Sequence, residues 1–115
     1  MNVVVVKGVL SRAPEVRALP SGEAVVNYEV TVRRVDGTAE GVPVVRYGEP
    51  SVEVAAGEEV VVTGRVRRRF FRSGGATQSR TEVVAEQVIP VARRRRVKAA
   101  LARASLALDL GDEAR

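Results

Sequence analysis

The stretch EVVVTGRVRRRFFR, residues 59–72, combines a valine run with five of the seventeen arginines of this chain. β-Branched residues favour strands, and side chains along a strand alternate between its two faces. We predict a strand over Glu59–Phe71. Its core face would carry Val60, Val62, Gly64 and Val66. Its solvent face would carry Val61, Thr63, Arg65, Arg67, Arg69 and Phe71. Phe70 is expected to point inward and cap the end of the core.

Four further segments have strand patterns: Asn2–Leu10, Glu23–Arg34, Val42–Tyr47 and Arg80–Val91. In the second of them Tyr28 falls on the apolar face, so we expect it in the core. Five short antiparallel strands with glycine-rich turns predict a small barrel or a sandwich. Residues 93–110 are rich in alanine, have apolar residues at helical spacing, and predict a helix. Its basic start and acidic finish oppose the helix dipole, so it needs packing, a partner or bound phosphate.

The composition of the 115 residues argues against an enzyme. The chain has no Cys and no His, which removes thiolate chemistry and the commonest general base and metal ligand. We therefore expect no metal and no cofactor. No apolar run approaches the roughly 20 residues of a membrane span. The start lacks the features of a signal peptide, so a cytoplasmic protein without membrane contact is expected.

The net charge of +5 is concentrated in the middle of the chain. Residues 60–98 carry a net charge of +9, whereas residues 1–59 carry −3. Such a segment is either a local anion-binding surface or simply a solvated basic face. Arginines that alternate along a strand and end at Phe71 suit a groove for single-stranded nucleic acid, since guanidinium groups bind phosphates and aromatic rings stack on bases. This pattern does not separate DNA from RNA.

A series of spaced motifs runs in order along residues 2–91. They are NVVVVKGVL (2–10), PEVR (14–17), PSG (20–22), VVNY (25–28), VVRYG (44–48), GEEVVVTGRVRRR (57–69) and TEVVAEQV (81–88). Together they resemble the bacterial single-stranded DNA-binding protein family. The resemblance implies an all-β fold, a five-stranded OB-fold barrel, here with a short C-terminal helix. It divides the chain into an OB-fold domain, residues 1–91, and a basic helical segment with a short acidic end, residues 92–115.

The resemblance to this family implies a function for the chain. Its members bind single-stranded DNA without strong sequence preference, in replication, repair or recombination. The resemblance places base stacking on Tyr47 and Phe71. It places basic contacts on Arg33, Arg46, Arg65, Arg67, Arg69 and Arg72. It also implies a homo-oligomer, a tetramer or dimer, paired through the face of the first strand that carries Val3, Val5, Lys7 and Val9.

Three features depart from the family pattern. The chain has no Trp, and aromatic residues make up 3% of it, so binding is expected to depend mainly on charge. The connector between Gly48 and Gly57 is short for the family's helix, which is expected to be reduced or absent. The end, LGDEAR (110–115), is only weakly acidic and lacks a terminal aromatic residue, so recruitment of other proteins by a tail is not expected.

Two other functions stay open at this point. One is an OB module that prefers RNA, which the low aromatic and high arginine content fits almost as well. The other is a structural or interaction subunit with weakened nucleic-acid binding, which the missing Trp residues and altered tail suggest. An enzyme is the least favoured function, because the sequence has no catalytic triad, phosphate-binding loop or metal-ligand cluster.

Overall fold

The computed structural model describes residues 1–50 and 52–113. These residues form six strands and one helix in the described part of the chain. The elements are β1 (Val4–Leu10), β2 (Glu15–Ala18), β3 (Ala24–Arg33), β4 (Ala39–Tyr47), β5 (Glu59–Ser73), β6 (Ala76–Pro90) and α1 (Arg94–Glu113).

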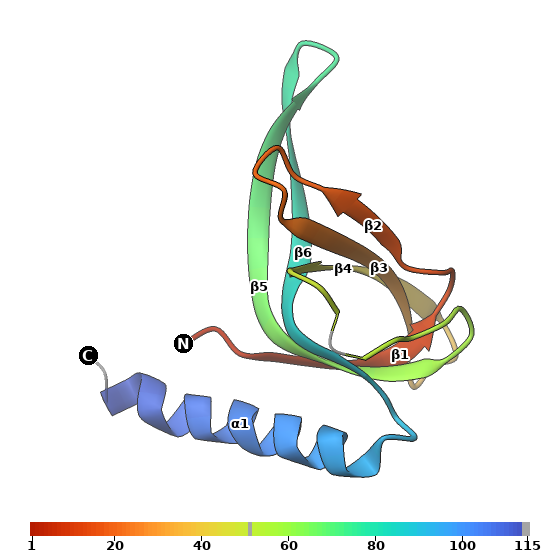
Figure 1. The fold of residues 1–115 in the computed structure, drawn as a ribbon, viewed down its shortest axis with the longest axis vertical. Helices are drawn as coiled ribbons and strands as arrows, with labels where there is room; N and C mark the ends of the chain where they lie inside the picture. The colour runs from red at the N-terminus through yellow and green to blue at the C-terminus, as the bar shows by residue number, and fades with distance from the viewer. Residues whose placement is uncertain (51, 114–115) are drawn as a thin grey trace.

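Five of the strands close into a ring in the order β1, β5, β6, β4 and β3 (Figure 1). The ring closes because the end of β1 pairs with β3, through Val9 opposite Thr31 and Leu10 opposite Val30. All ring pairings are antiparallel except the short parallel contact of β4 with β6. The strand β2 pairs with β3 outside the ring. The predicted five-stranded all-β architecture with a terminal helix is thus confirmed.

The core inside the ring is built mainly from valine. Val60 and Val62 are fully buried there, as alternation along the fourth predicted strand requires. Tyr28 also lies in this core, which confirms its predicted inward direction. Burial raises the pKa of the Tyr28 phenol, and the nearby Arg46 charge lowers it by a smaller amount. The other buried members are Leu10, Val26, Val30, Val44, Val83, Ala85 and Val88.

The strands β5 and β6 are 15 residues long each and extend beyond the ring as a two-stranded hairpin (Figure 1). The prediction for Phe70 is wrong, since its side chain is 65% exposed on this hairpin. Val66, assigned to the core face, is exposed as well. Both residues follow the alternation of the strand, but the hairpin projects past the core, so neither of its faces is covered by the ring.

The observed strands differ from the prediction in two places. The strand β2 was not predicted, because its four residues are exposed and follow Pro14, so it lacks the alternation that marks a half-buried strand. The strand β4 begins at Ala39, three residues before the predicted start at Val42. In the connector between Gly48 and Gly57, the described residues 48–50 and 52–57 contain no helix.

The helix α1 packs against the outside of β1, β5 and β6 and runs along one end of the molecule (Figure 1). Small residues make this contact, since Ala100 is buried and Ala104 is half-buried. Leu101, Leu106 and Leu108 are exposed to solvent. No helix in the described residues is long and apolar enough to cross a membrane.

Candidate nucleic-acid interface

The outward face of β5 carries alternate arginines into the hairpin, as the sequence predicts. Arg67 lies opposite Glu82 of β6, and Arg69 lies opposite Arg80. Side chains of directly opposite residues project from the same face of an antiparallel pair. Phe71 follows on this face, opposite Gln78. The strand therefore displays two guanidinium groups and a ring in sequence along one side of the hairpin.

Two cation–π contacts connect these arginines to aromatic rings. The guanidinium carbon of Arg67 lies 5.5 Å from the ring centroid of Tyr47, and that of Arg69 lies 5.3 Å from the ring centroid of Phe71. Arg67 also donates a hydrogen bond to the Tyr47 hydroxyl, at 2.8 Å. We call Tyr47, Arg67, Arg69 and Phe71 the stacking row. Its two rings are 39% and 37% exposed, so a planar ligand can reach them.

Glu82 lies beneath the stacking row. Its side chain is 6% exposed, and its Oε2 accepts a hydrogen bond from Arg67 and lies 3.5 Å from Nε of Arg69. Hydrogen bonds with Glu82 and, to a smaller extent, with Tyr47 raise the pKa of the Arg67 guanidinium above its ordinary value. A buried carboxylate requires such partners, because an unpaired buried charge is strongly unfavourable. The arrangement fixes both arginines in place.

A small apolar cluster lies beside the row on the outside of the sheet. Val25, Val45 and Val84 are buried there, and Leu19 packs against them. Tyr47 stands directly opposite Val25, on the same face of the β3–β4 pair. The end of the row on β4 therefore lies next to this buried apolar cluster.

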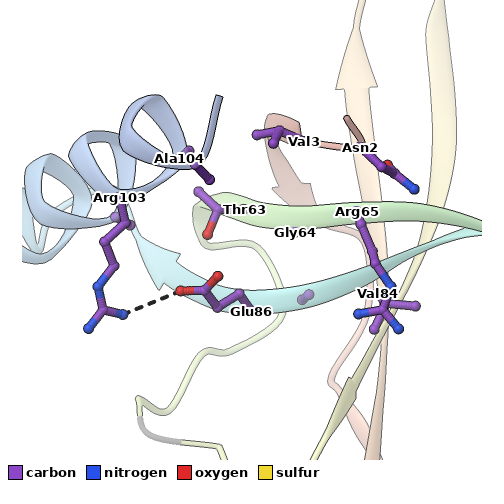
Figure 2. Close-up of a pocket in the computed structure, with 12 residues that line it drawn as sticks. Asn2, Val3, Thr63, Gly64, Arg65, Val84, Glu86, Arg103 and Ala104 are labelled. Atoms are coloured by element: carbon purple, nitrogen blue, oxygen red, sulfur yellow. Dashed lines mark hydrogen bonds and ion pairs between the residues drawn. The ribbon is translucent and has the colours of Figure 1, made fainter. Parts of the chain in front are cut away.

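Arg65 is exposed on the same face of β5, two residues before Arg67. It lines a pocket of about 360 Å³ between α1, strands β5 and β6, and residues 2–3 at the N-terminus (Figure 2). On the far side of that pocket Arg103 of α1 pairs with Glu86 of β6 at 3.3 Å (Figure 2). Arg65 thus lies between the stacking row and the helix.

The structure does not bring the other candidate residues into the row. Arg33 ends β3 eight residues after Val25, the partner of Tyr47, which is roughly 26 Å along a strand. Arg46 donates to the carbonyl oxygens of Glu49 and Glu86, so it ties β4 to its neighbours. Arg72 donates to the Gly75 carbonyl at the hairpin tip, and alternation puts it on the face opposite Phe71.

Glu82 is the residue of this site that sequence reasoning missed. It appears in the sequence as one polar residue of a strand motif, TEVVAEQV. Its position opposite an arginine depends on the register of β5 with β6, which contains an irregularity at Thr63 and Gly64. The available signal was that residues 60–98 contain eleven basic residues and only two acidic ones, Glu82 and Glu86. Among the described residues, no group of three or more His, Cys, Asp or Glu is placed to hold a metal ion.

Comparison with known proteins identifies the family of the chain. The model of the single-strand binding protein family matches residues 1–91. A protein described as a single-stranded DNA-binding protein from Oceanobacillus iheyensis is 34% identical over 99 residues. The match covers 76% of this chain and 62% of that protein, so the chain spans less than two thirds of its relative. The chain is a member of the single-strand binding protein family, and its ring of strands corresponds to the OB fold expected from the sequence.

Proposed function

We propose that this chain binds single-stranded DNA without strong sequence preference, with bases stacked along the row and phosphates held by nearby arginines. The observation that supports this most directly is the stacking row, in which two neighbouring guanidinium groups each lie close to an exposed aromatic ring. Aromatic and guanidinium planes accept any base, because every base has a π-face. The family and the name of the relative support the same ligand.

We assign binding to residues 1–91, with residues 92–115 as a basic helical segment with a short acidic end. Arg65, Arg67 and Arg69 are the arginines nearest the proposed path of the bound DNA. Arg33, Arg46 and Arg72 remain candidates for phosphate contacts outside the row. The proposed biological setting is replication, repair or recombination in the cytoplasm, and the proposal includes no catalytic reaction.

The direct test is fluorescence anisotropy of end-labelled oligonucleotides titrated with the protein. Single-stranded DNA, the same sequence as RNA, and duplex DNA are compared at two salt concentrations. We expect tighter binding to single-stranded DNA than to duplex DNA, retained at the higher salt concentration. Equal binding to all three, abolished by salt, would contradict the proposal and favour a structural subunit with a merely basic surface.

RNA is the second candidate ligand, and the composition of the chain supports it as an alternative. The chain has seventeen arginines and only four aromatic residues. Phosphate contacts of arginine act on both nucleic acids, and the exposed rings stack on bases of either. The RNA arm of the same titration ranks the two ligands. Tighter binding to RNA than to DNA would replace the proposed ligand.

Phe71→Ala is expected to weaken binding of single-stranded DNA about 5- to 150-fold, which corresponds to roughly 1–3 kcal/mol for one stacked base. Phe70→Ala is the matched control, because it removes a neighbouring and more exposed ring on the opposite face of the hairpin. The control is expected to bind like the unmodified protein. Anisotropy titration checks both variants, and a larger loss with Phe70→Ala would move the binding surface to the other face.

We also propose that the chain forms a homo-oligomer, a tetramer or a dimer, through the outward face of β1. Val5 and Val9 are exposed apolar side chains on this face, with Lys7 exposed between them. Exposed apolar patches often mark interfaces between proteins.

Val5→Lys combined with Val9→Lys is expected to reduce the molar mass in solution to that of a monomer. The reason is that two charged side chains would have to be buried at the proposed interface. Val16→Lys on the exposed strand β2 is the control and should leave the mass unchanged. Light scattering coupled to size-exclusion chromatography measures this. An unmodified protein that is already monomeric would refute the proposed assembly.

A further inference from the structure

Glu82 differs from the other acidic residue of the basic segment in both burial and partners. Glu86, four residues later on the same strand, is exposed and pairs with Arg103 of the helix. Glu82 is buried and contacts two arginines of the stacking row. Burial of a carboxylate costs free energy unless ion pairs and hydrogen bonds with neighbouring groups compensate for the lost hydration.

The contacts of Glu82 restrain both guanidinium groups. Its Oε2 accepts from Nη2 of Arg67 and lies close to Nε of Arg69, so one oxygen contacts two successive outward residues of β5. A contact at the edge of a guanidinium group leaves its flat faces available for stacking. The guanidinium carbons of Arg67 and Arg69 lie 5.5 Å and 5.3 Å from the ring centroids of Tyr47 and Phe71.

The same contact changes the charge that the row presents. Arg67 and Arg69 carry two positive charges, and the Glu82 carboxylate between them offsets one. A phosphate that approaches Arg67 must compete with a carboxylate that is already in place. Fewer phosphates are then neutralised at this point than the arginines of β5 alone would suggest.

We infer that Glu82 is a positioning residue for the binding of single-stranded DNA, because it holds Arg67 and Arg69 as flat platforms between the two rings and limits their phosphate contacts. Glu82 has this role only if single-stranded DNA binds along the row, as proposed above. The inference predicts that removal of the carboxylate raises the affinity for DNA at low salt and lowers it at high salt. Loss of the charge strengthens phosphate contacts, whereas loss of the restraint weakens stacking.

Glu82→Gln tests this, because it removes the charge and keeps the size of the side chain. One additional phosphate contact steepens the dependence of log affinity on log salt by about 0.7. The affinity of the variant relative to the unmodified protein should then fall about 2.6-fold for each fourfold rise in salt. We expect tighter binding at low salt and weaker binding at high salt, so that the two curves cross. Curves that run parallel would overturn the inference.

Two variants serve as controls. Glu86→Gln makes the same charge change on the same strand, away from the row, and should give a curve parallel to that of the unmodified protein. Glu82→Asp keeps the charge and shortens the side chain. It should leave the slope unchanged and weaken binding at every salt concentration. If Glu82→Gln does not fold, the aspartate variant decides, and unchanged affinity in that variant would overturn the positioning role.

The contact of Glu82 with the two arginines can also be measured in the free protein, without nucleic acid. In an NMR spectrum, the side-chain Nη2–H signal of Arg67 and the Nε–H signal of Arg69 report the contact with Glu82 directly. We expect both signals to shift in Glu82→Gln and to stay in place in Glu86→Gln. If the unmodified protein shows no preference for single strands, the proposed function fails even though these signals shift. If it binds single strands and the signals do not move, only the role of Glu82 fails.

Discussion

Replacing Gly64 with alanine is expected to destabilise the folded protein by about 3 kcal/mol or more, beyond the usual cost of an extra methyl group in a packed site. A Cβ atom at this position would lie 2.1 Å from the carbonyl oxygen of Val84 and 2.9 Å from Cα of Ala85. Both neighbours are backbone atoms of β6, so a change of side-chain rotamer cannot relieve the overlap. The two strands would have to separate where the register between them shifts.

Gly41→Ala is the matched control for this substitution. It also lies within a strand, but its added Cβ would meet only the end of the Glu29 side chain, at 2.8 Å from Oε1. That flexible carboxylate can move away, so the stability should change by no more than about 0.5 kcal/mol. Thermal unfolding followed by circular dichroism measures both variants. The Gly64 variant should unfold about 10–20 °C lower, and equal midpoints for the two variants would show that β6 adapts to the extra atom.

Alternation predicted the core face of the first half of β5, but the solvent face predicted for Val61 and Thr63 is wrong, because both residues are buried. The helix α1 packs against the outside of this strand. Val60 and Val62 face that core, and the same reasoning placed Tyr28 inside the ring. Arg67 and Arg69 are displayed on the outside as expected. In these segments a slip of one residue would bury arginine and expose valine, so the sequence pattern admits one orientation.

The same reasoning failed where the core ends. Phe70 has the predicted direction relative to its neighbours, but the hairpin has carried it beyond any interior. How far a β-strand extends beyond its sheet depends on its pairing partner. The partner of β5 is β6, which pairs with it out to Ala76 at the hairpin tip. A sequence pattern defines which residues share a face, whereas it does not define what lies opposite that face.

The remaining differences in the site have the same physical origin. Arg33 and Arg46 were grouped with Tyr47 by family motif, but the register of β3 with β4 places Arg33 at the other end of the pair. Arg46 is one residue from Tyr47 and therefore points to the opposite face, where it binds backbone carbonyls. The contact between Tyr47 and Arg67 joins β4 and β5, which are consecutive in the sequence but separated by β6 in the sheet. This contact depends on the pairing of β4 with β6.

The affinity for single-stranded DNA is expected to fall steeply with salt, with a slope of log affinity against log salt of roughly −4 to −6. This follows if six to eight phosphates are neutralised per site at about 0.7 each. Six arginines are candidates for phosphate contacts: Arg65, Arg67 and Arg69 on the outward face of β5, and Arg33, Arg46 and Arg72 outside the row. A fourfold rise in salt should then weaken binding roughly 250- to 4,000-fold, a larger effect than the loss of any one ring.

Arg65→Gln and Arg103→Gln separate specific phosphate contacts from the general effect of positive charge. Each variant removes one charge, but Arg65 lies on the outward face of β5, whereas Arg103 lies on α1 and is paired with Glu86. Arg65→Gln should make the slope shallower by about 0.7, and Arg103→Gln should leave it unchanged. A slope steeper than roughly −6 would add the basic start of α1, residues 93–96, to the binding surface. A shallow slope combined with complete loss of binding in Phe71→Ala would instead mean that stacking, and not charge, holds the DNA. In that case the release of counterions would contribute little to the affinity.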